Sequence, residues 1–155
     1  MSNIVSRTVE VCVFKAEEHG PKYLLLKRSA EDSLYPGMWQ FMTGTMNEGE
    51  HAVKAAIREF REETGLEVAN CWVVPYVNTF YVAATDTVHT SPFFAIEVDP
   101  RDQPRLSHEH QEYAWCTLED ARRRLVWPGQ RYGLRIVDEY IVGKQEASRL
   151  LSLSV

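Results

Sequence analysis

The chain has 155 residues, 45% hydrophobic and 25% charged, which is typical of one compact globular domain and excludes a disordered, collagen-like or coiled-coil protein. We therefore expect a single domain over residues 1–155. The net charge of −5 disfavours nucleic acid as a partner, because a surface that follows phosphates needs clustered positive charge. The sequence has no run of 18 apolar residues and no secretory-signal pattern at its start, which predicts no membrane contact and a cytoplasmic location.

In chain order, the first predicted elements are two strands, one at 7–15 with alternating valines and one at 23–28 in a short apolar run. A polar loop follows, and a third short strand is predicted at 38–43, just before Gly44. Residues 50–64 contain no glycine or proline and are rich in helix formers. This segment is predicted to be a helix of about four turns.

β-Branched and aromatic residues return after this helix and predict two long strands, at 68–84 and 88–98. A polar loop leads to a last short strand at 113–116. Residues 117–120 have the form of a helix-capping box, which predicts a helix that continues through Leu125.

The Pro128-Gly129 pair is predicted to interrupt that helix, and a final helix is predicted at 130–142. Strands, one helix, more strands and two helices in this order favour an α+β fold, with a mixed β-sheet flanked by helices, over a repeating βαβ pattern.

The helix predicted at 50–64 gathers acidic side chains on one side. A buried stripe is predicted at Val53, Ile57, Phe60 and Thr64. Glu59, Glu62 and Glu63 lie roughly opposite at i, i+3 and i+4, where their like charges destabilise the helix unless a cation neutralises them. Taken alone, such a triplet fits a solvated acidic surface as well as a cation site.

The triplet is part of a longer motif. Gly44 is followed after five residues by Glu50 and after seven more by Arg-Glu-Phe-Arg-Glu-Glu-Thr-Gly-Leu at 58–66. This pattern resembles the signature of the Nudix hydrolases, and every fixed position is met. The resemblance implies an α/β/α sandwich and hydrolysis of a nucleoside diphosphate linked to a further group, X. His51 departs from relatives that often have a capping Ser, Thr or Asp at this position.

Both the charge balance and the resemblance imply a divalent metal ion. A negative chain that presents carboxylates would repel a polyphosphate unless cations bridge the two, and hard oxygen ligands favour Mg²⁺, with Mn²⁺ as an alternative. The three cysteines lack metal-ligand spacing and are predicted to be buried free thiols. The resemblance assigns roles to residues Arg58, Glu59, Glu62, Glu63, Thr43 and Gly44.

Among these, Glu62 and Glu63 would be metal ligands, and Glu59 would be a further ligand or the base that activates water. The carbonyl near Thr43-Gly44 would complete the coordination. Arg58 would pair with Glu50 to hold the loop on the helix.

A late acidic residue is also predicted from the resemblance. Glu109 lies six residues before Trp115, as the late catalytic glutamate does in several Nudix groups, where it is a catalytic residue and a metal ligand. Glu112 is the competing candidate. His108 and His110 are predicted to form hydrogen bonds in the loop, because a Mg²⁺ site prefers oxygen ligands.

The sequence also suggests a class of substrate. Residues 38–44, Met-Trp-Gln-Phe-Met-Thr-Gly, resemble the segment that enters the motif in bacterial dihydroneopterin triphosphate and dATP pyrophosphohydrolases. This implies a small heterocycle triphosphate, and a flat base requires aromatic walls. Candidate substrate-binding residues are Arg28, Trp39, Gln40, Phe80, Tyr81 and Trp127.

Three alternatives stay open. Asn-Thr-Phe-Tyr-Val at 78–82 lacks the proline typical of ADP-ribose-cleaving relatives and keeps dinucleoside polyphosphates of the Ap4A type as a candidate substrate. A Nudix module that binds nucleotides without turnover is disfavoured, because such members lose glutamates of the motif. The resemblance is also compatible with a homodimer.

Overall fold

The structure is a computed structural model that describes all residues from 1 to 155. Its strands are β1 (Asn3–Val5), β2 (Thr8–Glu17), β3 (Gly20–Arg28), β4 (Trp39–Gln40), β5 (Met42–Thr45), β6 (Asn70–Val82), β7 (Thr87–Glu97), β8 (His110–Cys116) and β9 (Ser152–Leu153). Its helices are α1 (Ala52–Thr64), α2 (Leu118–Arg124), α3 (Pro128–Ile136), the π-helix η1 (Val137–Val142) and α4 (Glu146–Leu151).

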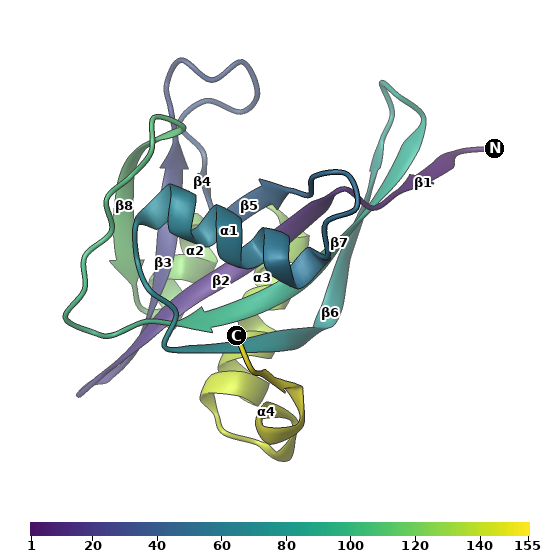
Figure 1. Cartoon of the computed structure of the whole chain (residues 1–155). Coiled ribbons are helices and arrows are strands. Elements are labelled where there is room, and N and C mark those ends of the chain that lie inside the picture. The colour runs from purple at the N-terminus through teal and green to yellow at the C-terminus, as the bar shows by residue number, and fades with distance from the viewer.

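The strands form one mixed sheet, in which β4, β3, β2, β7, β6 and β9 lie side by side in that order. Strands β2 and β7 pair in parallel at its centre, and β1 pairs in parallel with the beginning of β7. Strand β5 pairs with β2 and β8 pairs with β3, both antiparallel. Figure 1 shows the long β6–β7 hairpin projecting beyond the sheet next to β1.

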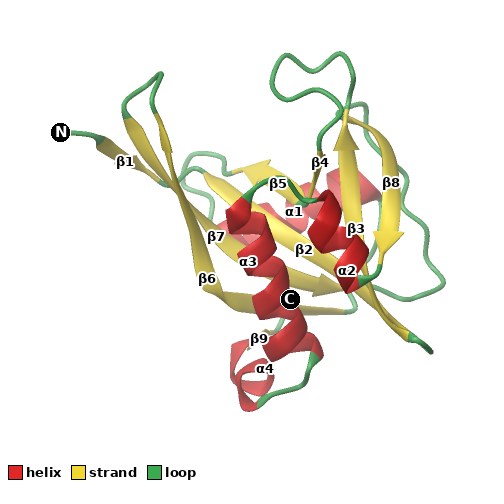
Figure 2. Cartoon of the chain, turned by 180° about the vertical axis from the view of Figure 1, so that it is seen from behind, coloured by secondary structure: helices red, strands yellow, loops and turns green.

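Helices cover both faces of this sheet. Helix α1 lies on one face, and α2, α3 and η1 lie on the other (Figures 1 and 2). The side chains of β2 alternate between the two layers, so that Val9, Val11 and Val13 pack toward α1, whereas Cys12 and Phe14 pack toward α3. The predicted α+β class, with a mixed sheet flanked by helices, is confirmed.

Several predicted elements differ from the structure at their ends. The single strand predicted at 38–43 is broken at Phe41 into β4 and β5, which pair with different neighbours. The Pro128-Gly129 pair begins α3 instead of interrupting a helix, because proline at the first helical position lacks only an N–H that would have no helical partner anyway. The last predicted helix continues as the π-helix η1. The sequence did not indicate β1, α4 or β9.

The capping prediction for α2 is confirmed, since the Thr117 side chain accepts a hydrogen bond from the Asp120 N–H. The His51 side chain makes no such bond at the start of α1. The predicted buried stripe of α1 is only partly correct. Phe60 and Thr64 are buried, but Val53 and Ile57 are half-buried.

The three cysteines are buried and free, as predicted. Burial raises the pKa of Cys71 and that of Cys116 to about 11, so both thiols are protonated at neutral pH. No helix is long and apolar enough to cross a lipid bilayer.

The packing of α3 on the sheet leads to a prediction about Gly133. A Cβ atom at this position would lie 2.5 Å from Cζ of Phe93 on β7, so a methyl group there must displace a fully buried ring. We expect Gly133→Ala to lower the free energy of unfolding by about 1–3 kcal/mol, the usual effect of overpacking a core. Urea unfolding measures this change. Arg135→Ala, on the exposed side of α3, is the matched control, and equal stability of the two variants would contradict the packing argument.

Candidate active site

The close contact between β5 and α1 positions the first carboxylate of the site. A Cβ atom at Gly44 would lie 2.3 Å from Cγ of Glu59, so only glycine allows the helix to approach the strand this closely. Oε1 of Glu59 accepts a hydrogen bond of 3.2 Å from the Thr45 N–H. The Glu59 carboxylate is therefore held beside the backbone of β5.

Arg58 connects the loop before α1 to the acidic side of the helix. Its guanidinium donates two hydrogen bonds of 2.9 Å to Glu50, one of 2.9 Å to the Thr45 carbonyl and one of 3.0 Å to Glu59. Hydrogen bonds from Arg58 and from the backbone of Asn47 lower the pKa of Glu50 to about 2. The structure thus contains the predicted pair between Arg58 and Glu50.

Glu63 lies in a different environment from its neighbours on the helix. Its side chain is only 6% exposed. Its Oε2 atom accepts a hydrogen bond of 2.6 Å from the Ser107 hydroxyl and lies 3.1 Å from Nδ1 of His110. Burial alone would raise the pKa of Glu63, but hydrogen bonds from His110 and Ser107 outweigh it and hold this pKa below its usual value.

The loop before β8 brings Glu109 to the same place. Ligand atoms of Glu63, Glu109 and His110 all lie within 4.8 Å of one another. Burial, together with the nearby Glu63 carboxylate, raises the pKa of Glu109. Glu112 forms an ion pair of 2.7 Å with Lys27 and lies outside this group. The hydrogen bond between His110 and Glu63 agrees with the role predicted for this histidine, although His110 begins β8 and is buried.

A small polar hollow of about 190 Å³ lies between α1, β5 and this loop. It has no apolar lining residue and is lined by Thr8, Thr43, Gly44, Thr45, Glu59 and Glu109. Carboxylate and carbonyl oxygens are the donors that hard divalent cations prefer, so the residues present fit a Mg²⁺-type ion. Glu62 is 57% exposed and lies 3.3 Å from the Arg58 guanidinium. The structure therefore gathers Glu59, Glu63 and Glu109, with Glu62 at the edge.

A second cavity, of about 440 Å³, adjoins this hollow and shares Thr43 with it. Exposed aromatic rings of Tyr35, Phe80 and Trp127 form part of its wall, and the rings of Tyr35 and Trp127 meet edge to face at 5.2 Å. The remaining lining residues are Glu10, Arg28, Leu34, Met38, Gln40, Thr43, Asn78, Thr79, Pro128, Gly129 and Gln130.

Four of the six predicted substrate-binding residues line this cavity: Arg28, Gln40, Phe80 and Trp127. Trp39 does not. Its ring faces the Arg124 guanidinium at 4.9 Å and the Lys27 ammonium at 5.7 Å. Tyr81 does not line it either, and its hydroxyl donates a hydrogen bond to Asp86 at the end of the β6–β7 hairpin.

Arg28 is already engaged by its own loop. Its guanidinium donates hydrogen bonds to Asp32 at 2.6 Å and to the Leu34 carbonyl at 2.8 Å, and it lies 3.5 Å from Oε1 of Gln40. These contacts order the segment that carries Tyr35. Arg28 therefore shapes the cavity wall as well as adding positive charge beside it.

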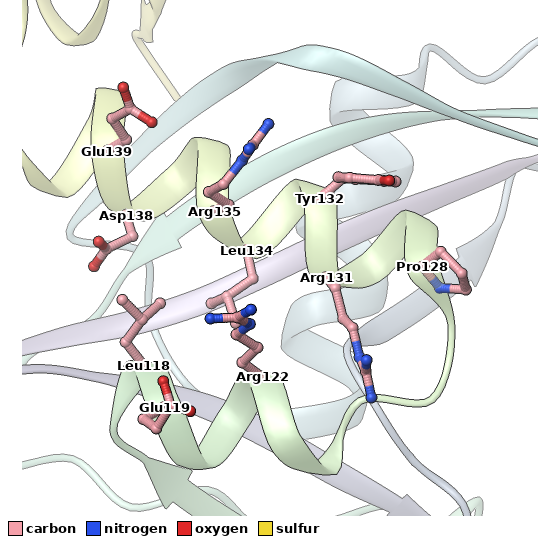
Figure 3. A pocket seen from close by; sticks show the side chains of 10 residues that line it. All are labelled: Leu118, Glu119, Arg122, Pro128, Arg131, Tyr132, Leu134, Arg135, Asp138 and Glu139. Carbon is pink, nitrogen blue, oxygen red and sulfur yellow. The ribbon is translucent and has the colours of Figure 1, made fainter.

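A larger hollow, of about 600 Å³, lies between α2 and α3 (Figure 3). It is lined by Leu118, Glu119, Arg122, Pro128, Arg131, Tyr132, Leu134, Arg135, Asp138 and Glu139. None of these residues belongs to the motif at 44–66 or to the acidic hollow. Asp138 accepts a hydrogen bond from the buried Tyr23 hydroxyl, which ties η1 to β3. Size alone does not identify the active site here.

Sequence reasoning missed several residues of the site. Ser107 was not singled out, although it contacts Glu63 directly. Glu10, Asn78 and Gln130 are buried polar residues of the second cavity. The signal for Glu10 was present, because it is an acidic residue within a valine-rich strand whose two faces are both covered.

The comparisons with known proteins agree with this geometry. The NUDIX domain model matches residues 6–135. The chain therefore belongs to the Nudix family, and it is a hydrolase that cleaves pyrophosphate linkages.

Two curated relatives and one solved structure show the range of similarity. The chain is 34% identical over 132 residues to an octanoyltransferase of Myxococcus xanthus. This match covers 81% of the chain but only 34% of the octanoyltransferase. It is 33% identical over 102 residues to the asymmetrical bis(5'-nucleosyl)-tetraphosphatase of Mus musculus, and this match covers 64% of the chain and 67% of the tetraphosphatase. The Ap4A hydrolase of C. elegans superposes with a TM-score of 0.73 at 25% identity, over 90% of this chain and 98% of that one.

The contacts of Arg58 lead to a prediction for Arg58→Lys. A lysine ammonium cannot replace the planar fork that bonds Glu50, Glu59 and the Thr45 carbonyl together. We expect the free energy of unfolding to fall by about 1–3 kcal/mol, the value of charged hydrogen bonds, and hydrolysis to weaken as the loop loosens. Urea unfolding and an activity assay measure both effects. Arg61→Lys on the same helix is the control, because its ion pair with Glu67 is exposed, and equal losses in both variants would refute the network.

Proposed function

We propose that this protein is a Mg²⁺-dependent pyrophosphohydrolase, acting as a single domain, that converts a nucleoside or pterin triphosphate into the monophosphate and pyrophosphate. One observation carries this proposal. The aromatic-walled cavity and the acidic hollow adjoin each other at Thr43, so a base in the cavity would direct its phosphates toward the carboxylates. The entry segment at 38–44 also resembles that of enzymes with such substrates.

The metal ion would be held by Glu59, Glu63 and Glu109, with the backbone carbonyls near Thr43 and Gly44 completing its oxygen ligands. When bound, it would offset the negative charge of the phosphates and lower the pKa of a water molecule. Glu62, on the same side of α1 and 3.3 Å from Arg58, would add a further carboxylate ligand. The donor set favours Mg²⁺ and accepts Mn²⁺.

Side chains of the site orient the carboxylates and accept the proton of the attacking water. Arg58 holds Glu59 and the Thr45 carbonyl in place, so that the carboxylate does not need to reorganise during the reaction. Ser107 and His110 orient Glu63 in the same way. Glu109 lines the hollow, and its pKa, raised by burial and by the nearby Glu63, suits it to take the proton of the attacking water.

A second candidate substrate is a dinucleoside tetraphosphate of the Ap4A type. The similarity to the Mus musculus tetraphosphatase and to the C. elegans Ap4A hydrolase supports it. In that case the cavity would hold one of the two nucleosides. A module that binds nucleotides without turnover is disfavoured by the presence of all four glutamates of the motif.

A screen of phosphate and pyrophosphate release distinguishes these candidates. It would offer nucleoside triphosphates, dihydroneopterin triphosphate, diadenosine polyphosphates and ADP-ribose with Mg²⁺ and with Mn²⁺. Pyrophosphate released from a triphosphate supports the first candidate, whereas cleavage of diadenosine tetraphosphate alone supports the second. No release from any compound would contradict both.

Glu63→Gln tests the metal site. The amide keeps the size of the side chain but removes a charged oxygen ligand, so we expect kcat with Mg²⁺ to fall by at least roughly 100-fold without loss of the fold. Steady-state kinetics and circular dichroism measure the two properties. Glu67→Gln, the same change at an exposed position just after α1, should retain activity. A fully active Glu63→Gln enzyme would remove Glu63 from the metal site.

Glu109→Gln and Glu112→Gln separate the two candidates for the late catalytic acid. Glu109 lies beside Glu63, whereas Glu112 pairs with Lys27. We therefore expect kcat to fall more for Glu109→Gln, by about 10²–10⁴-fold if it is the general base. Substrate-saturated rates of the two variants at one pH are the measurement. The reverse order would move the role to Glu112.

A further inference from the structure

Glu10 of β2 lies in the second cavity with one oxygen unused. The residue is 4% exposed and faces the α3 side of the sheet, as Cys12 and Phe14 do. Its Oε1 atom accepts a hydrogen bond of 2.6 Å from Nδ2 of Asn78, whereas its Oε2 atom has no hydrogen-bond partner. Burial raises the pKa of Glu10, and the Asn78 and Gln130 side chains offset only part of that rise, so Oε2 stays without a full hydrogen bond of its own.

Gln130, in the first turn of α3, repeats this feature. It is 3% exposed and lines the same cavity, and its Oε1 atom is buried without a partner. Two unpaired acceptors therefore lie in one cavity, next to the aromatic rings of Phe80 and Trp127. Native proteins leave few buried polar atoms unpaired, so a ligand that brings donors to both acceptors would account for them.

The packing of α3 fixes this arrangement. A Cβ atom at Gly129 would lie 2.0 Å from Oδ1 of Asn78, so the first turn of the helix rests directly on the amide. The amide is thereby held with its nitrogen toward Glu10. Because Asn78 occupies one carboxylate oxygen, only Oε2 is free for a ligand.

We propose that Glu10 and Gln130 select the base, and that they select the edge of carbonyl, ring N–H and amino group that guanine and pterins share. This edge presents a ring N–H next to an exocyclic amino group, which gives three donor hydrogens on two nitrogens bonded to the same carbon. Oε2 of Glu10 would accept from one of these groups and Oε1 of Gln130 from the amino group. Adenine offers an amino group beside a bare ring nitrogen, whose lone pair a carboxylate repels.

This inference deepens the proposed function and rests on it, since it assumes that the cavity holds the base of the substrate. The inference also means that the enzyme distinguishes its substrates by their heterocyclic base. The aromatic walls stack on any flat base, whereas buried acceptors discriminate strongly against a base that lacks the matching donors.

The test compares kcat/KM for GTP, dihydroneopterin triphosphate and ATP in the wild type and in Glu10→Gln. We expect the wild type to prefer the first two over ATP by about 10- to 100-fold, the value of a pair of base-edge hydrogen bonds. Glu10→Gln should reduce this ratio, because a carboxamide can donate to the ring nitrogen of adenine. Glu97→Gln on β7, outside the cavity, is the matched control and should leave the ratio unchanged.

Binding of GMP, IMP and AMP, measured by isothermal titration calorimetry, separates the failure of this inference from failure of the proposed function. IMP keeps the ring N–H but lacks the amino group, so the expected order of affinity is GMP, IMP, AMP. If the three nucleotides bind in this order and Glu10→Gln abolishes the order, the assignment of Glu10 and Gln130 to base selection stands even where no triphosphate is cleaved. If triphosphates are cleaved without preference for guanine or pterin, the assignment is overturned while the proposed function stands.

Gln130→Met serves where Glu10→Gln fails to fold. It keeps the length of the side chain in the first turn of α3 but removes the amide oxygen. We expect it to weaken GMP binding more than AMP binding, by about tenfold. Equal effects on the two nucleotides, or a wild type that binds AMP more tightly than GMP, would refute the role of these residues.

Discussion

The close approach of β5 to α1 at Gly44 is the constraint on which the acidic site depends. Because Glu59 occupies the space that a side chain at position 44 would fill, its carboxylate lies against the strand and beside the polar hollow. That position places negative charges near one another, and Arg58 offsets part of their repulsion by bonding Glu50 and Glu59 at once. The buried Gly44 and the guanidinium of Arg58 thus allow several carboxylates to lie close together on a stable helix.

Strands β2 and β5 link this acidic site to the cavity beside α3. The odd-numbered valines of β2 pack under α1, whereas Glu10 points to the α3 side, and Glu10 pairs in register with Thr43 of β5. Thr43 lines both the hollow and the cavity. A ligand bound across this point would have its base in contact with one layer of the sandwich and its charged groups in contact with the other. Small shifts between the layers would then affect binding and chemistry together.

Local patterns in the sequence predicted most of what is local in the structure. The motif at 44–66, the alternation of β2 and the capping of α2 each depend on residues within a few positions of one another. The direction of a side chain near a strand end, in contrast, does not depend on sequence neighbours alone. Trp39 and Tyr81 were predicted to bind substrate, yet Trp39 packs beside Arg124, and Tyr81 bonds within its own hairpin. Which face each side chain takes depends on strand register, which composition does not reveal.

That the acceptors of the cavity meet could not be predicted from the sequence, for a related cause. Glu10, Asn78 and Gln130 come from β2, β6 and α3, and nothing in their separate segments indicates that they meet. Leaving Oε2 of Glu10 and Oε1 of Gln130 unpaired costs about 1–3 kcal/mol for each group, in a domain whose total stability is on the order of 10 kcal/mol. A fully apolar lining would avoid that cost and would still stack on a flat ring. The unpaired acceptors are therefore better explained by selection among bases than by stability of the fold.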